Sequence, residues 1–284
     1  MKERLAPAGS VAAVNVSRLI VHADDFGETV EITRGICEAI EGGAVTSTTI
    51  MANMPGTADA LPRVQRLADR ASFGVHLNLC EGRPLTSGPT LVDQQGRFHR
   101  KRELFLRSVT GRLSLKEVAA EVTAQISVVH EAGVRISHVD GHKHLHQLPV
   151  VSAAVAQVLP HFGIERVRVT RLGSLRQIKA ASTLMREVLS VPARATFRRA
   201  QLRSPERVVD LQAIMDLKPG ADTGASLRES RGPIEMFCHP GTARADMEKP
   251  GSCARYEELQ FLLSARFRAL VENNGLRLVT YWDV

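Results

Sequence analysis

Short apolar runs alternate along most of the chain with longer segments of helical periodicity. Apolar, largely β-branched or aliphatic runs at 19–22, 45–52 and 73–79 indicate strands. The segments after the first two runs, 29–42 and 56–70, indicate helices, because their apolar residues recur at helical spacing. This half of the chain therefore predicts the order strand, helix, strand, helix, strand.

The same alternation continues through the second half. Ser114, with Glu117 three residues on, predicts the start of a helix over 114–132. Further strands are predicted at 134–140, 164–170, 207–211, 234–239 and 276–281, and further helices at 148–162 and 255–273. About seven strand–helix units without a composition break favour an α/β fold, a single (β/α) barrel over 1–284 that is TIM-like and distorted or seven-stranded. A doubly wound sheet is the alternative.

Two segments interrupt this pattern. Residues 81–113 have Gly and Pro punctuation and weak periodicity, which predicts a long inserted loop. A second, basic insertion is expected near 171–206, where Pro192 is expected to interrupt any long helix.

Composition fits this architecture. Hydrophobic residues make up 44% of the chain and aromatics only 4%, so aliphatic side chains must fill the core. No apolar run approaches the ~18 residues of a membrane span, and the N-terminus lacks the apolar stretch of a secretory signal. The four scattered cysteines form no CxxC pair, which is typical of a reducing cytoplasm.

The positive charge is concentrated in one block. The net charge is +7, and residues 163–207 hold eleven Lys or Arg against three acidic residues. We interpret the block chiefly as a solvated helical face, and we expect no nucleic-acid partner, because no aromatic or Gly-rich pattern accompanies it. Its apolar residues, Leu184, Met185, Val188 and Leu189, also allow peripheral contact with an anionic membrane.

Strand alternation places two polar side chains on one face of the third strand. In 73–79 the aliphatic residues at odd positions point to one side, whereas His76 and Asn78 point to the other. The apolar side would face helices, so His76 and Asn78 are expected inside the barrel near its C-terminal mouth. Taken alone, His76 would more often be a hydrogen-bonded core histidine.

A second cluster strengthens the case for a site. Residues 138–146 hold four of the ten histidines, and Asp140, His142 and His144 share one strand parity. Crowded imidazoles beside an aspartate are costly unless a cation or carboxylates offset their charge. The cluster therefore indicates a functional site rather than a polar loop enriched in histidine by chance.

Two more polar motifs follow strands. Asp24 and Asp25 point in diverging directions, so one carboxylate can bind a cation while the other stays free as a base, although the motif also fits a turn with a helix N-cap. His239 ends a strand before a Pro–Gly turn. All these residues lie at C-terminal strand ends, where barrel active sites are found.

In combination, the motifs resemble the YdjC-like carbohydrate deacetylases, a group that includes chitooligosaccharide and hopanoid-associated deacetylases. The resemblance covers most of the chain and thins between 163 and 207. It rests on ADDFG (23–27), VTSTT (45–49), GVHLNLCEGRPL (74–85), HVDGHKHLH (138–146) and CHPG (238–241).

The resemblance implies a barrel related to the NodB-type polysaccharide deacetylases, with one divalent metal, Mg²⁺ favoured and Zn²⁺ second. By position, Asp25, His76 and His142 would be the metal ligands, Asp24 the general base and His239 the general acid. The implied reaction hydrolyses the amide of an N-acetylated amino sugar, oligosaccharide or lipid-linked. The resemblance also favours a homodimer as the assembly.

The remaining polar residues and the reaction class stay open. Asn78, Asp140 and His144 would orient ligands or contact substrate, with Asp140 a candidate to fix the tautomer of a ligating imidazole. The alternatives are a metal-dependent hydrolase of another bond, such as a phosphoester, a metal-free glycosidase, or a non-catalytic sugar- or lipid-binding barrel.

Overall fold

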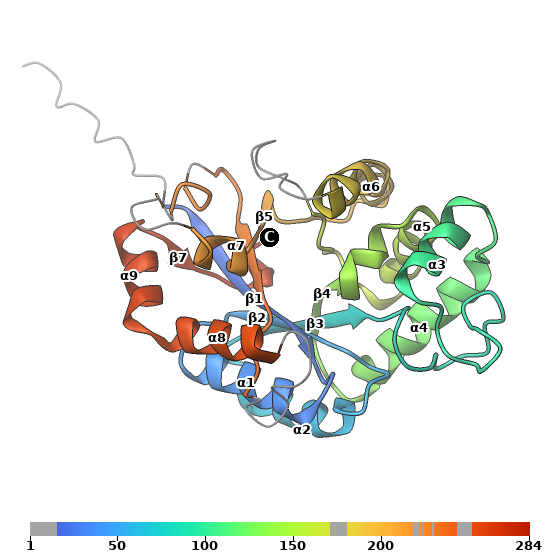
Figure 1. Cartoon of the computed structure of the whole chain (residues 1–284), viewed down its shortest axis with the longest axis horizontal. Helices are drawn as coiled ribbons and strands as arrows, with labels where there is room; N and C mark the ends of the chain where they lie inside the picture. The colour runs from blue at the N-terminus through green and yellow to red at the C-terminus, as the bar shows by residue number, and fades with distance from the viewer. Residues whose placement is uncertain (1–15, 171–180, 218–221, 223, 229, 243–251) are drawn as a thin grey trace, which may run out of the picture.

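A computed structural model describes residues 16–284 of the chain except 171–180, 218–221, 223, 229 and 243–251. A parallel sheet runs through the middle of the molecule and helices cover it (Figure 1). The hydrogen-bonded order is β4-β3-β2-β1-β6-β5, with β7 beside the start of β1. The strands are β1 (Arg18–Phe26), β2 (Ser47–Ile50), β3 (Ser72–Leu77), β4 (Ile136–Gly141), β5 (Arg207–Asp210), β6 (Ile234–Cys238) and β7 (Arg277–Leu278).

The predicted α/β fold with a parallel sheet is confirmed, and the sheet has seven strands, although the described residues do not close it into the predicted barrel. Two isolated parallel bridges, Val139 with Val167 and Arg166 with Arg203, continue the pairing beyond β4. Among the described residues no ladder joins β5 back to β4, so the described sheet is an open one.

The helices follow the strands in the expected alternation, with several additions. They are α1 (Val30–Glu41), α2 (Thr57–Leu67), α3 (Lys101–Val109), α4 (Leu115–Glu131), α5 (Pro149–Val158), α6 (Ala181–Arg199), α7 (Leu211–Met215), α8 (Ser252–Leu263) and α9 (Ala265–Asn273). Short 3₁₀ segments lie at η1 (His142–Gln147), which is interrupted by left-handed residues at Lys143 and His144, and at η2 (Leu159–Phe162) and η4 (Tyr281–Asp283).

Local chemistry explains where the helices begin. The Thr29 side chain accepts a hydrogen bond from the Ile32 N–H at the start of α1, and Ser114 accepts one from the Glu117 N–H at the start of α4. The buried face of α1, which includes Ile36 and Ile40, packs into the main core with the aliphatic residues of β1. These helices hold the strand ends that carry the candidate chemistry.

We predicted that the segment 81–113 is a long loop, and this prediction is wrong in part. It contains the helix α3, whose Leu104 is fully buried. Its backbone is also fastened to α4, because the buried Glu121 carboxylate accepts hydrogen bonds from the N–H groups of Leu85 (3.1 Å) and Thr86 (2.9 Å). The segment shows weak apolar periodicity because part of it is held to α4 by hydrogen bonds to Glu121 rather than by an apolar face.

Three other boundaries differ from the sequence prediction. The predicted strand 164–170 makes only isolated bridges. The predicted helix 255–273 divides at Ser264, whose side chain caps α9 by accepting from the Phe267 N–H. Of the predicted strand 276–281, only two residues pair with β1 before the chain turns into η4.

The basic insertion near 171–206 contains α6, which runs through Pro192 rather than ending there. The side chains proposed for membrane contact, at 184–189, lie outside the described residues, as does the segment 171–180. Within the part of the chain that the structure describes, no helix is both long and apolar enough to cross a membrane.

Candidate metal centre and active site

An irregularity at the end of β1 separates the two adjacent aspartates. The register between β1 and β2 shifts between Ala23 and Phe26, and Asp25 has a left-handed backbone with φ +71°. Such a conformation costs a non-glycine residue roughly 1 kcal/mol and often marks a functional position. As a result Asp24 and Asp25 point toward different partners, as their adjacency had suggested.

Asp25 meets two imidazoles from other strand ends. Its Oδ1 lies 3.2 Å from Nε2 of His76, at the end of β3, and 3.0 Å from Nδ1 of His142, just after β4. One ligand atom from each of these three residues lies within 4.8 Å of the others, and all three residues are buried. The structure thus brings together the three residues that the resemblance named as metal ligands.

The electrostatics of this cluster fit a divalent cation. Burial disfavours a charged ring at His142, but the neighbouring carboxylates of Asp25 and Glu81 outweigh it and raise the pKa of His142 to about 9. The same imidazoles hold the pKa of Asp25 well below its usual range despite its burial. Positive charge is therefore favoured here, and protons and a cation compete for the same ring nitrogens. One carboxylate and two imidazoles suit magnesium, manganese or zinc chemically.

Arg255, which no sequence motif singled out, also contacts Asp25. Its Nη2 lies 2.6 Å from Oδ2 of Asp25 and 3.0 Å from Glu28. The residue comes from α8, so helix packing alone brings it to the end of β1. The guanidinium restrains one Asp25 oxygen and leaves the other facing the two histidines.

Asp24 forms a buried ion pair with Arg168. The guanidinium donates to both carboxylate oxygens of Asp24, at 2.9 and 2.7 Å, and also to Glu235 at 2.5 Å. Burial raises the pKa of Asp24, but the charge of Arg168 outweighs it and lowers that pKa to about 2. Arg168 is fully buried, so the interpretation of the basic block as a solvated face is wrong at this residue.

Asp140 binds the ring nitrogen of His76 that faces away from Asp25. The two residues are direct neighbours in the β3–β4 register, and Nδ1 of His76 lies 2.7 Å from Oδ1 of Asp140. Thr49 and Arg168 also bind Asp140, at 3.1 and 3.0 Å. A carboxylate on Nδ1 favours the tautomer that leaves Nε2 of His76 free to face Asp25.

His239 follows β6 and lies on the open side of the site. Its Nε2 is 3.8 Å from Oδ2 of Asp24, and its side chain is 35% exposed. The following turn packs tightly on α1, because a Cβ at Gly35 would lie 2.5 Å from Cα of Gly241. This close approach fixes the turn that carries His239 relative to β1.

The structure places the other two predicted residues apart from the three-residue cluster. Asn78 uses its side chain on the protein itself, accepting from the N–H groups of Cys80 and Glu81 and donating to the Glu81 carbonyl and to Asn53. His144 has a left-handed backbone, with φ +59°, and its ring meets Phe237 edge to face. That backbone ends the strand parity assumed for 138–146.

A buried polar layer lies beneath the site. His22 contacts Ser47 and Thr49 at 2.9 and 3.2 Å, and His138 stacks on Tyr281 with ring centroids 3.4 Å apart. His146 is the third histidine of this layer. Burial lowers its pKa to about 4, so its neutral ring donates to the Arg168 carbonyl at 2.8 Å. Several histidines thus support the site from within the core.

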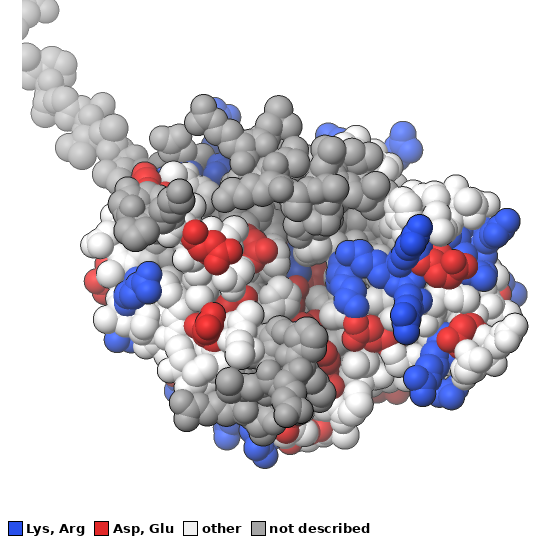
Figure 2. Space-filling model, viewed as in Figure 1, with Lys and Arg blue, Asp and Glu red and all other residues white. Residues whose placement is uncertain are grey.

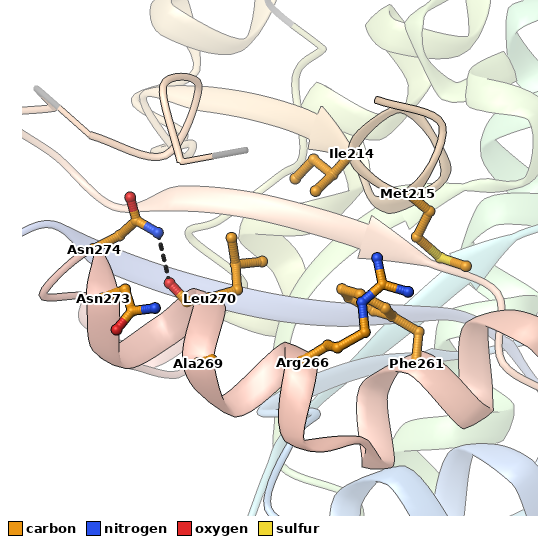
Figure 3. A pocket seen from close by; sticks show the side chains of 8 residues that line it. All are labelled: Ile214, Met215, Phe261, Arg266, Ala269, Leu270, Asn273 and Asn274. Atoms are coloured by element: carbon orange, nitrogen blue, oxygen red, sulfur yellow. Dashed lines mark hydrogen bonds between the residues drawn. The ribbon is translucent and has the colours of Figure 1, made fainter. Parts of the chain in front are cut away.

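The surface view shows how charged side chains are distributed over one face of the molecule. Figure 2 shows acidic side chains inside a hollow at the centre of the face, with Lys and Arg side chains over the region where Figure 1 places α3. A separate pocket of about 280 Å³ lies between α7 and the α8–α9 pair (Figure 3). It includes none of the candidate site residues and is lined by Ile214, Met215, Phe261, Arg266, Ala269, Leu270, Asn273 and Asn274.

Fold and site together define a parallel α/β protein with a candidate cation site at the carboxyl ends of its strands. Residues 18–273 match the family model described as YdjC-like protein. The chain therefore belongs to the YdjC-like family, which confirms the resemblance found in its motifs.

Similar proteins support this assignment. The chain is 32% identical over 267 residues to a chitooligosaccharide deacetylase of Yersinia enterocolitica, covering 93% of this chain and 98% of the relative. It is 43% identical to a carbohydrate deacetylase of Halalkalibacterium halodurans over 130 residues, about half of either protein (45% of this chain and 54% of the relative).

Among solved structures, an Enterococcus faecalis protein assigned provisionally to cellobiose-phosphate cleavage superposes with a TM-score of 0.75 at 24% identity, covering 94% of this chain and 98% of that one. At this identity the likeness concerns the fold alone.

Proposed function

We propose that this chain is a hydrolase that removes the N-acetyl group from an amino sugar and uses one divalent cation. The observation that carries the proposal is the convergence of Asp25, His76 and His142 from three strand ends, beside a separately held Asp24. The names of the full-length relatives, carbohydrate and chitooligosaccharide deacetylases, supply the substrate class.

Asp25, His76 and His142 would hold the cation, with Mg²⁺ favoured and Zn²⁺ second. A bound divalent cation supplies electrophilic polarisation of the acetamide carbonyl and a lowered pKa for the attacking water. Arg255 and Asp140 would keep the ligands oriented, since each binds one of them through an atom that faces away from the cluster.

Asp24 would act as the general base. Its low pKa keeps it ionised at neutral pH, which is the form that accepts a proton, and Arg168 fixes the direction of its two oxygens. His239 would act as the general acid that protonates the departing sugar amine. Its ring is 35% exposed and lies 3.8 Å from Asp24, so the proposed acid and base are close neighbours.

The test is acetate release from N-acetylglucosamine, N,N′-diacetylchitobiose and a lipid-linked N-acetylglucosaminide. Metal-stripped protein is assayed with and without added Mg²⁺ or Zn²⁺, beside an Asp25→Asn variant. We expect release that depends on added metal and is lost in the variant. Release that persists in a chelator would contradict the proposal. Metal-dependent hydrolysis of a phosphoester without acetate release would favour the alternative reaction.

A further inference from the structure

The two candidate histidine ligands are oriented in opposite senses. His76 faces Asp25 with Nε2, whereas His142 faces the same Asp25 oxygen with Nδ1. Each ring therefore turns its second nitrogen outward. For His76 that nitrogen is hydrogen-bonded to Asp140, and for His142 it lies 3.3 Å from Oε1 of Glu81, within ion-pair distance but outside hydrogen-bond geometry.

Glu81 is fixed in place by its neighbours. The Asn78 side chain holds both backbone groups of Glu81, accepting from its N–H at 3.1 Å and donating to its carbonyl at 2.9 Å. The Glu81 carboxylate also contacts the Lys143 ammonium. Lys143 has a left-handed backbone, with φ +54°, directly after His142. The chain thus accepts local strain at the residue that pairs with Glu81.

We propose that Glu81 is the positioning residue of His142. This role rests on the proposed cation site. When a cation occupies that site, the Glu81 carboxylate accepts the Nε2–H of His142 and keeps the Nδ1 lone pair directed toward Asp25. Asp140 does the same for His76, with the two ring nitrogens exchanged. The two carboxylates differ in exposure, because the Asp140 side chain is fully buried and that of Glu81 is 34% exposed. The carboxylate that contacts His142 can therefore be substituted without disturbing the core.

The same contacts assign Asn78 a role. Because its side chain is committed to the turn at 78–81, it acts on the site by holding Glu81 rather than by contacting substrate.

The experiment measures Zn²⁺ affinity by competition with a chromophoric chelator, for Glu81→Ala, Glu81→Gln and the control Glu165→Gln. Glu165 is exposed and pairs with Arg203. We expect Glu81→Ala to weaken binding about 10- to 100-fold. The glutamine variant retains an oxygen acceptor, so it should stay closer to wild type than Glu81→Ala, and the control should be unchanged. Wild-type affinity in Glu81→Ala would overturn the proposal, and a glutamine variant as weak as alanine would show that Glu81 acts by charge or ligation instead.

A second measurement needs no substitution. In ¹⁵N-labelled wild-type protein with Zn²⁺ bound, the His142 ring should carry its proton on Nε2, and a proton on Nδ1 would overturn the proposal even if Glu81→Ala failed to fold. The proposed function fails separately, if wild-type protein binds neither Mg²⁺ nor Zn²⁺ or if Asp25→Asn binds Zn²⁺ equally well.

Discussion

Arg168 donates hydrogen bonds to both carboxylate oxygens of Asp24, although the two residues are 144 positions apart, and both are buried. The same guanidinium reaches Asp140 and Glu235. The Arg168 guanidinium therefore contacts three buried carboxylates at the candidate site. Such an arrangement is expensive to break, because loss of one partner leaves charge in a poorly solvated interior.

Replacing Arg168 with Met should consequently lower the free energy of unfolding by about 3–5 kcal/mol. The matched control is Arg203→Met, since Arg203 pairs with Glu165 and both side chains are at least half exposed. That change should cost less than about 1 kcal/mol. Urea denaturation of both variants checks the difference, and equal stabilities would contradict a structural role for the buried pair.

Substituting Asp24 with Asn should separate catalysis from cation binding. Asn cannot accept the water proton, so kcat for acetate release should fall about 10²–10⁴-fold. Zn²⁺ affinity should change little if the cation occupies the Asp25–His76–His142 cluster, and should fall if it occupies the second group of possible ligands, Asp24, His76 and Asp140. Asp59→Asn, a change in the Asp59–Arg63 pair on α2, serves as the control. Loss of turnover together with loss of Zn²⁺ binding would argue against separate roles.

Cation stabilisation should grow with pH. The usual pKa of His142, 6.5, is raised to about 9 in the folded chain, so the metal-free protein gains stability from this protonated ring below pH 6.5 and loses it as pH rises toward 9. A cation needs the neutral ring. The difference in Tm between protein in saturating Mg²⁺ and in chelator should therefore widen from pH 6.5 to 9. A constant difference across that range, measured by scanning fluorimetry, would count against His142 as a ligand.

Removal of the Glu121 carboxylate should loosen the segment that follows β3. Glu121→Ala leaves the N–H groups of Leu85 and Thr86 without their acceptor, which should cost about 1–3 kcal/mol. Glu131→Ala, at the exposed end of the same helix, should change stability by less than about 0.5 kcal/mol. Chemical denaturation compares the two, and similar values would show that water replaces the lost acceptor.

The sequence by itself predicted the parallel α/β fold and the family. Strand periodicity depends on neighbouring residues, so the runs at 19–22, 73–79 and 134–140 could be placed without a structure. The same rule put His76 at a strand end, and β3 and β4 then bring it beside Asp140. The family resemblance named Asp25, His76 and His142 as candidate ligands, and these residues lie near the carboxyl ends of strands, which share one edge of a parallel sheet.

Tertiary structure alone decided the partners of those residues. Arg168 and Arg255 lie 144 and 230 positions from the aspartates they bind, and no local pattern distinguishes them from solvated basic residues. The opposite orientations of His76 and His142, on which the proposed role of Glu81 depends, appear only once β3 and the left-handed turn after β4 are folded together. Periodicity records which face a residue occupies, whereas the pairing of buried charges depends on packing between distant elements, and only the folded chain determines it.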